Sequence, residues 1–234
     1  MMAPHACRQI GLHNVNQCGQ LCLLRMEKAD EAVYDRAMSR KPTAAARLAD
    51  APSARERILQ TAHDLFYLEG IRATGIDRVI AESGVTKVTL YRHYPNKNDL
   101  ILAFLDYRHQ RWMTWFGGAL QRFGADAAAL LPTMAEWFAH PQYRGCAFIN
   151  TVAELGPVLP EAVQRARDHK RQMQARIAEL LPASEDRDAR AQALAIAVDG
   201  AIVRAACDAS PDAALASLKM AIDAFAYAGD RASR

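Results

Sequence analysis

The sequence predicts an all-α fold in which a three-helix unit near the N-terminus is joined to a larger helical domain. Apolar residues recur every three or four positions along much of the chain, as in Ile76, Val79 and Ile80, and this is the spacing of one buried helix face. Residues that cap or end helices, such as Gly84, stand between these segments. The predicted parts are an N-terminal extension at 1–50, the three-helix unit at 51–97 and the larger domain at 98–230.

The composition is that of a soluble globular protein. The chain has 234 residues, of which 51% are hydrophobic and 24% are charged, so it is long enough to bury a core. Its formal net charge of +3 is too small to indicate nucleic-acid binding, and evidence for it has to be local. Five cysteines and no secretory signal predict reduced thiols in the cytoplasm. Asp199 and Arg204 interrupt the longest apolar run, so we expect no membrane span.

Residues 1–50 carry no periodic apolar face. We expect a disordered tail or an over-long start, with Met26 and Met38 as alternative first residues. The spacing of Cys18 and Cys22 falls in the range for zinc ligands, but no second matched pair follows. We therefore predict no metal site and no cofactor.

Local signals define the first helices. Ser53 and Glu56 form a capping box at the start of the first ordered helix, and Gly70 closes it. The next helix ends at Gly84, because the tight turn that follows needs a residue that tolerates a positive φ. Asn96 is predicted to cap the helix that begins after Pro95.

The segment after Gly84 has the composition of a helix that reads DNA. Its predicted outer face carries cations, hydroxyls and aromatic rings and no carboxylate. Such groups contact phosphates and base edges in the major groove, as in a helix-turn-helix. The alternative is a packing module whose basic face is only solvated. We predict base contacts from Thr86, Lys87 and Thr89, phosphate contacts from Tyr91, His93 and Lys97, and further DNA contacts from Arg92 and Tyr94.

The stretch GVTKVTLYRHYPNKNDL at 84–100 resembles the signature of the TetR (tetracycline repressor) family, and the resemblance extends over about 53–101. It departs from the family pattern at Val88, where a small residue is usual, and at Gly75, where a hydroxyl residue is common. The resemblance implies a homodimeric, ligand-responsive transcriptional repressor, without enzymatic activity, that binds a palindromic operator in double-stranded DNA.

The larger domain is rich in bulky apolar residues. A helix from Asn98 to Phe116, ending before Gly117, links the three-helix unit to this domain. The default interpretation is an ordinary core; the alternative is a cavity that accepts a small, mostly apolar effector. The stretch RGCAFINTVAEL at 144–155 also resembles part of the ligand-binding half of one TetR subgroup. The predicted ligand-binding set is Trp112, Trp115, Phe116, Met134, Trp137, Phe138, Cys146, Phe148 and Asn150.

Within that stretch, Asn150 and Glu154 share a helix face. They are expected either to present polar groups to a ligand or to satisfy neighbouring backbone groups.

Two helices near the C-terminus have apolar residues at alternating steps of three and four. Such stripes predict a paired helix seam. The resemblance to the TetR family implies that this seam forms a four-helix bundle with a second subunit. The alternative is that both stripes pack inward within one chain. The predicted dimer interface is Leu194, Val198, Ile202, Leu215, Leu218, Ile222 and Phe225.

The sequence thus predicts a DNA-binding transcriptional regulator. An enzyme is not expected, because the chain has no G-x-S-x-G, no H-E-x-x-H and no phosphate-binding glycine loop. The remaining alternative is an architectural or small-molecule-sequestering helical protein without sequence-specific DNA readout.

Overall fold

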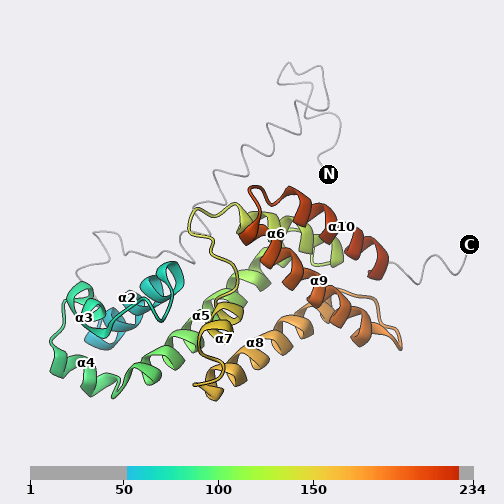
Figure 1. The fold of residues 1–234 in the computed structure, drawn as a ribbon. Coiled ribbons are helices and arrows are strands. Elements are labelled where there is room, and N and C mark those ends of the chain that lie inside the picture. The colour runs from blue at the N-terminus through green and yellow to red at the C-terminus, as the bar shows by residue number, and fades with distance from the viewer. Residues whose placement is uncertain (1–51, 227–234) are drawn as a thin grey trace, which may run out of the picture. The chain divides into compact units, whose positions relative to one another are not determined.

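The structure is a computed structural model that describes residues 52–226, and all regular secondary structure in this range is helical (Figure 1). This confirms the predicted all-α class. The predicted N-terminal extension and its cysteines lie outside the described residues. In the first half of the described range the helices are α2 (Ala54–Glu69), α3 (Ile76–Ser83), α4 (Lys87–His93) and α5 (Lys97–Arg122).

The second half contains one short 3-10 helix and five α-helices. Within 52–226, no helix is both long and apolar enough to cross a membrane. The elements are η3 (Ala127–Ala129), α6 (Leu130–Phe138), α7 (Ala147–Leu155), α8 (Pro160–Glu179), α9 (Arg187–Cys207) and α10 (Asp212–Phe225).

The helix boundaries follow the local signals. At the start of α2, the Glu56 N–H donates to Ser53 Oγ (3.3 Å) and the Ser53 N–H donates to Glu56 Oε2 (2.8 Å), which completes the predicted capping box. Gly84 ends α3 with φ 66° and ψ 31°, the left-handed conformation expected of this turn. At the start of α5, Asn96 Oδ1 accepts the Asp99 N–H (2.9 Å). These predicted caps are confirmed.

Helix α5 is longer than predicted. It continues through Gly117 and Gly118 to Arg122, and the backbone takes a positive φ only at the following Gly124 and Ala125. A glycine in a helix interior costs about 1 kcal/mol relative to alanine. The apolar face of α5 nevertheless continues beyond the glycine pair with two buried side chains, those of Ala119 and Leu120. Their burial explains why the helix does not end there.

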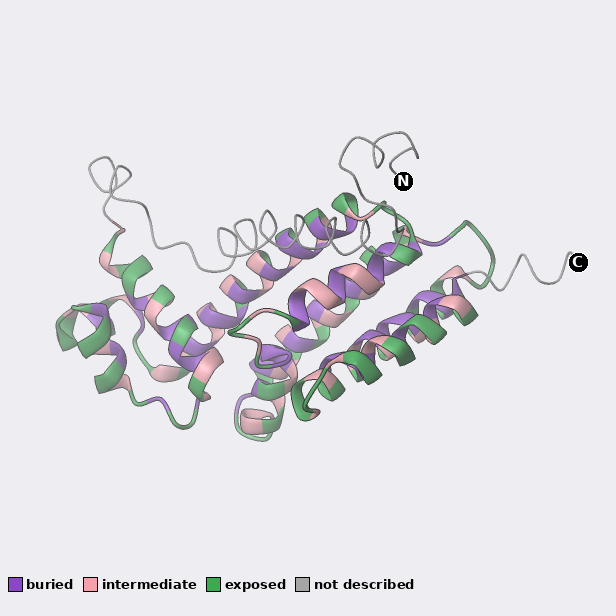
Figure 2. Ribbon diagram, turned by 90° about the horizontal axis from the view of Figure 1, so that it is seen from above, coloured by how far each residue is buried: buried purple, intermediate pink, exposed green. Residues whose placement is uncertain are grey.

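The helices pack around α5. The N-terminal half of α5 lies against α2, and the rest contacts α6, α7 and α8. Helices α9 and α10 pack on each other and on α6, and α9 also packs on α8. The buried faces of the helices point toward one another (Figure 2). Several buried polar side chains were not expected from the sequence. His169 is one of them, and it lies on the inner face of α8, in line with Ala162, Ala166 and Met173.

Candidate nucleic-acid interface

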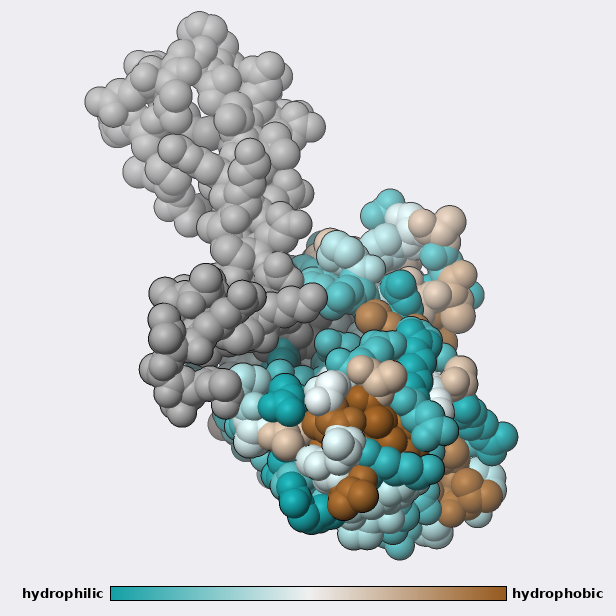
Figure 3. Space-filling model, turned by 90° about the vertical axis from the view of Figure 1, so that its left-hand side faces the viewer, coloured by the Kyte–Doolittle hydropathy of each residue, from teal (hydrophilic) through white to brown (hydrophobic). Residues whose placement is uncertain are grey.

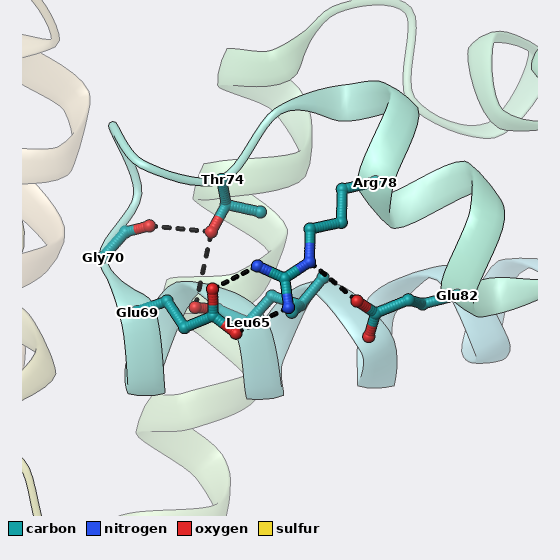
Figure 4. Close-up of polar contacts among 6 residues, drawn as sticks. All are labelled: Leu65, Glu69, Gly70, Thr74, Arg78 and Glu82. Atoms are coloured by element: carbon teal, nitrogen blue, oxygen red, sulfur yellow. Dashed lines mark hydrogen bonds and ion pairs between the residues drawn. The ribbon is translucent and has the colours of Figure 1, made fainter.

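The helix-turn-helix is held together by polar contacts between α2 and α3. The guanidinium of Arg78 lies between Glu69 at the end of α2 and Glu82 in its own helix, and it donates to both carboxylates (Figure 4). In the connecting loop, Thr74 Oγ1 donates to the carbonyls of Gly70 (2.8 Å) and Leu65 (3.4 Å). These contacts fix α3 on α2, and α3 and the buried Leu90 fix the position of α4.

Helix α4 presents the predicted reading face. Thr86 is its N-cap, and its Oγ1 accepts the Thr89 N–H (3.2 Å), so these two hydroxyl residues also stabilise the helix. Lys87 is exposed, with only a long 4.0 Å ion pair to Asp77. Val88 is 77% exposed. In the sequence this residue is a departure from the family pattern; in the structure its place beside Lys87 adds an apolar group to the surface of α4.

The remaining side chains of α4 lie on the same surface. Tyr91 and Arg92 are exposed, and His93 at the end of the helix is half-buried. The surface seen from this side of the molecule is mostly hydrophilic, with small hydrophobic areas (Figure 3). No carboxylate occurs between Thr86 and His93, so this face suits a polyanion.

The prediction for Tyr94 is corrected. This residue is only 2% exposed, its hydroxyl donates to the Arg55 carbonyl (3.4 Å), and burial raises the pKa of the phenol. It follows α4 in extended conformation, which turns its side chain into the core. Tyr94 anchors α4 on α2 and is not part of the DNA-contacting surface.

Lys97 has a structural role that the sequence did not indicate. Its Nζ donates to the carbonyls of Ile71 (2.6 Å) and Thr74 (2.7 Å) in the loop before α3. Burial lowers its pKa, against the opposing effect of the nearby Glu154 carboxylate. The predicted phosphate contact at the start of α5 remains a prediction, and two of the three ammonium protons are already used within the protein.

The DNA-binding helices are tied to the rest of the chain at one joint. Glu154 of α7 accepts the backbone N–H groups of Arg72 (2.8 Å) and Ile71 (3.4 Å). Tyr67 of α2 donates to the Gly145 carbonyl (3.1 Å) and accepts the Arg144 N–H (3.0 Å). The sequence left open whether Glu154 faces a ligand or accepts hydrogen bonds from neighbouring backbone. The structure shows that it accepts hydrogen bonds from backbone N–H groups.

The predicted ligand-binding residues form a dense aromatic cluster, and all of them except Asn150 are buried. Trp112 stacks on Phe116 with ring centroids 4.6 Å apart and meets Trp137 edge-on at 5.6 Å. The indole N–H groups of Trp112 and Trp137 are buried and find no acceptor in the described part of the chain. Asn150 is exposed and lies apart from this cluster, and its side-chain amide donates to the Arg144 carbonyl (3.0 Å).

The predicted dimer interface needs correction at five positions. Leu194, Val198, Ile202, Leu218 and Ile222 are at most 3% exposed, because they fill the space between α9, α10 and their neighbours within one chain. The alternative in which these stripes pack inward is the one that the structure shows.

The other faces of these two helices carry exposed apolar side chains. Ile196 and Val203 project from α9, and Met220 and Phe225 from α10. Leu215, also in the predicted set, is half-buried. We call Ile196, Val203, Met220 and Phe225 the outer α9–α10 face.

Comparison with known proteins identifies the helix-turn-helix. The family described as bacterial regulatory proteins, tetR family, matches residues 58–104. An uncharacterised HTH-type transcriptional regulator of Bacillus subtilis, YxaF, is 44% identical over 54 residues, which are 23% of this chain and 28% of that protein. The chain thus matches less than a third of the length of this curated relative.

Solved structures extend the similarity to the rest of the chain. A TetR-family transcriptional regulator from Streptomyces coelicolor is 32% identical, with a TM-score of 0.66 over 74% of this chain and 96% of that one. The regulatory protein TetR from Rhodobacter sphaeroides is 25% identical, with a TM-score of 0.61 over 74% of this chain and 98% of that one. Both the helix-turn-helix unit α2–α4, which we call the reading head, and the helical domain behind it are therefore shared. The chain belongs to the TetR family of transcriptional regulators.

Proposed function

We propose that this regulator is a repressor that binds a palindromic operator as a homodimer in the cytoplasm and releases it when a small effector binds. The surface of α4 carries the proposal. Its exposed Lys87, Val88, Tyr91 and Arg92 combine cationic, apolar and aromatic groups on one short helix, which suits base edges and phosphates in a major groove.

Dimerisation is proposed through the outer α9–α10 face. Exposed apolar side chains on neighbouring helices are expected to be covered by an identical face related by a twofold axis. Two reading heads would then meet half-sites about one DNA turn apart, ~34 Å.

Effector response is proposed to act through α5. This helix starts at Lys97, which holds the loop before α3, and runs on to Trp112 in the aromatic cluster. A ligand that moves α5 would change the spacing of the two heads and release the operator. The indole N–H groups of Trp112 and Trp137 have no acceptor within 52–226, which supports a ligand site near this cluster.

The operator is tested by selecting bound fragments from sheared genomic DNA of the source organism at two salt concentrations. We expect a short palindrome to be enriched upstream of a few genes at both concentrations. Binding that is blind to sequence and lost at the higher salt would overturn the operator model and favour an architectural role.

The role of α4 is tested by Lys87→Ala on the selected operator. If Lys87 contacts a base edge, its removal should weaken the discrimination between the preferred base and the other bases at that position. The expected loss in binding free energy for the preferred base is about 1 to 3 kcal/mol. Arg176→Ala removes one charge from α8, where Arg176 pairs with Glu179 (2.9 Å), and serves as the control. If Lys87→Ala prefers the same operator sequence as the parent, Lys87 does not contact a base as proposed.

A further inference from the structure

A cavity of about 240 Å³ lies at the joint between the DNA-binding helices and the rest of the chain. A cavity of about 150 Å³ can hold one benzene molecule, so this space suits a ligand of one or two rings. Its walls come from α2, α5, α7 and the loops before α3 and α7, and they combine aromatic and apolar side chains with polar and charged ones. The residues that matter here are Phe66, Tyr67, Phe104, Ala147, Asn150 and Glu154.

The polar groups at the cavity leave no carboxylate oxygen unused. Both oxygens of Glu154 already accept backbone N–H groups, from Ile71 and Arg72. The Asn150 amide donates to a carbonyl of the loop before α7. The guanidinium of Arg144 also lines the cavity, but it is exposed to solvent, and one of its nitrogens donates to the carbonyls of Tyr143 (2.7 Å) and Pro141 (3.4 Å). A buried cationic site for a ligand therefore depends on what adjoins the cavity.

A buried cation without a carboxylate partner adjoins it. Arg108 lies one turn beyond Phe104 on α5, is 3% exposed, and stacks over the Tyr67 ring, with Cζ 4.0 Å from the ring centroid. One terminal nitrogen approaches His63 Nε2 at 3.4 Å, and the other is buried with no partner among residues 52–226. Burial lowers the pKa of His63 from 6.5 to about 4, so this imidazole is neutral near pH 7.

A second arginine repeats the pattern three residues later. Arg111 donates to the Tyr107 hydroxyl (2.7 Å), while its Nε and its other terminal nitrogen are buried without an acceptor in the described range. Neither Arg108 nor Arg111 forms an ion pair with a described carboxylate. Burying a guanidinium without an anion is costly, and a cation–π contact offsets only part of that cost.

We propose that the effector is a small organic anion with an aromatic or other apolar body. Its oxyanion binds the guanidinium of Arg108, with Arg111 adding positive charge, and its body occupies the cavity against Phe66 and Phe104. This proposal rests on the proposed ligand response, and it places the effector one turn of α5 closer to the DNA-binding helices than the aromatic cluster.

The position of Tyr67 explains how such a ligand would act on DNA binding. The ring of Tyr67 covers Arg108 and its side chain also lines the cavity, so the anion reaches the guanidinium by turning this ring aside. That movement breaks two hydrogen bonds of the Tyr67 hydroxyl, the one that it donates to the Gly145 carbonyl and the one that it accepts from the Arg144 N–H. Arg108 thereby loses its cation–π contact with Tyr67 and gains an ion pair with the anion. At the same time α2 loses its Tyr67 hydrogen bonds to the loop before α7.

The test uses the full chain and matched pairs of probes: benzoate, phenylacetate, salicylate and indole-3-acetate, each with its uncharged amide. Thermal unfolding is followed with and without each probe at millimolar concentration. We expect at least one acid to raise Tm by several degrees while its amide has no such effect. Equal effects of acid and amide, or no effect of any acid in the set, would overturn the proposal.

Two variants separate a binding role of Arg108 from a structural one. If Arg108 only stabilises the fold, Arg108→Met should lower Tm in the absence of probe. If it is an anion site, Arg108→Met should melt at or above the parent Tm and require at least tenfold more acid for the same shift. Arg176→Met, which removes an exposed and paired guanidinium, should keep the parent response.

The same probes added to the operator complex distinguish this proposal from the function on which it rests. Release of operator by an acid and not by its amide supports both. A Tm shift by acid together with no operator binding in the absence of probe would keep the anion site and overturn the repressor model. Operator binding that no acid relieves, with no acid-specific Tm shift, would keep the regulator and overturn the anion site.

Discussion

Lys97 is a single residue on which the position of the reading head depends. Its ammonium donates to two backbone carbonyls of the loop before α3, those of Ile71 (2.6 Å) and Thr74 (2.7 Å). Lys97→Met should therefore lower the free energy of unfolding by about 1 to 3 kcal/mol, measured by urea denaturation at pH 7.5. Lys87→Met, at an exposed position, should change it by less than about 0.5 kcal/mol. Equal effects of the two variants would contradict this role.

His63 makes stability depend on pH. Its Nδ1 faces Asp64 (2.9 Å) and its other side faces Arg108 and the nearby Arg111, but burial dominates and lowers its pKa from 6.5 to about 4. Between these values the unfolded chain binds more protons than the folded one, so stability falls as the pH falls. Burial lowers the pKa of His169 as well, which acts in the same direction.

The contribution of His63 can be measured by denaturation at pH 7 and pH 5. We expect the parent to lose about 2 kcal/mol over this interval through His63 alone. His63→Gln should show a smaller loss because the titrating group is gone. A variant that keeps the full pH dependence of the parent would show that His63 is not responsible.

At the scale of residues, the sequence predicts what local chemistry decides. Ser53 with Glu56 and Asn96 with Asp99 are three positions apart, so their caps could be predicted without knowledge of the fold. The partners of Lys97 lie 23 and 26 residues away. Such contacts depend on how helices cross, which a periodic pattern does not encode. The same limit hid the buried guanidinium of Arg108, one nitrogen of which has no partner among residues 52–226.

At the scale of elements, α5 shows how packing overrides propensity. An added Cβ at Gly117 would meet no atom within 4 Å apart from the helix itself, and its φ is not positive. Gly117→Ala should therefore raise the free energy of unfolding by about 0.5 to 1 kcal/mol. Gly84 has equally open surroundings but a φ of +66°, so Gly84→Ala should lower it by about 1 kcal/mol. Urea denaturation of both variants checks this, and a loss of stability in Gly117→Ala would contradict it.

Helices α9 and α10 show a second limit at this scale. Each carries two apolar stripes, and periodicity alone does not tell which stripe faces the chain's own core and which faces solvent or a partner. The stripe with Leu194 and Val198 has the stronger pattern and is buried within the chain. The outer face, with Ile196 and Met220, is interrupted by alanine and polar residues and gave no comparable signal.

At the scale of the whole molecule, the reading head and the helical domain meet through the packing of α2 on α5 and through a few polar contacts. Glu154 holds the N–H groups of the 70–74 loop, Lys97 holds its carbonyls, and Tyr67 ties α2 to the loop before α7. Under the proposed effector response, a ligand that disturbs one of them would change the position of the head without unfolding either part. The family resemblance predicted these two parts, whereas the joint itself became visible only in the structure.

The outer α9–α10 face is the proposed subunit interface, so a charge placed in it should prevent assembly. If this face is the subunit interface, Met220→Asp should place a charge in it and convert a dimer of the 25.8 kDa chain into a monomer. Val158→Asp is the matched control, because Val158 is also exposed (65%) but lies in the turn between α7 and α8. Light scattering after size-exclusion chromatography gives the mass of each variant.

Operator binding of the same variants connects assembly to function. A single head makes half of the contacts, so monomeric Met220→Asp should bind the palindrome at least ~100-fold more weakly, while Val158→Asp keeps the parent affinity. A Met220→Asp protein that stays dimeric would move the interface to another surface. A monomer that binds the operator as tightly as the parent would instead show that the two heads are not needed together.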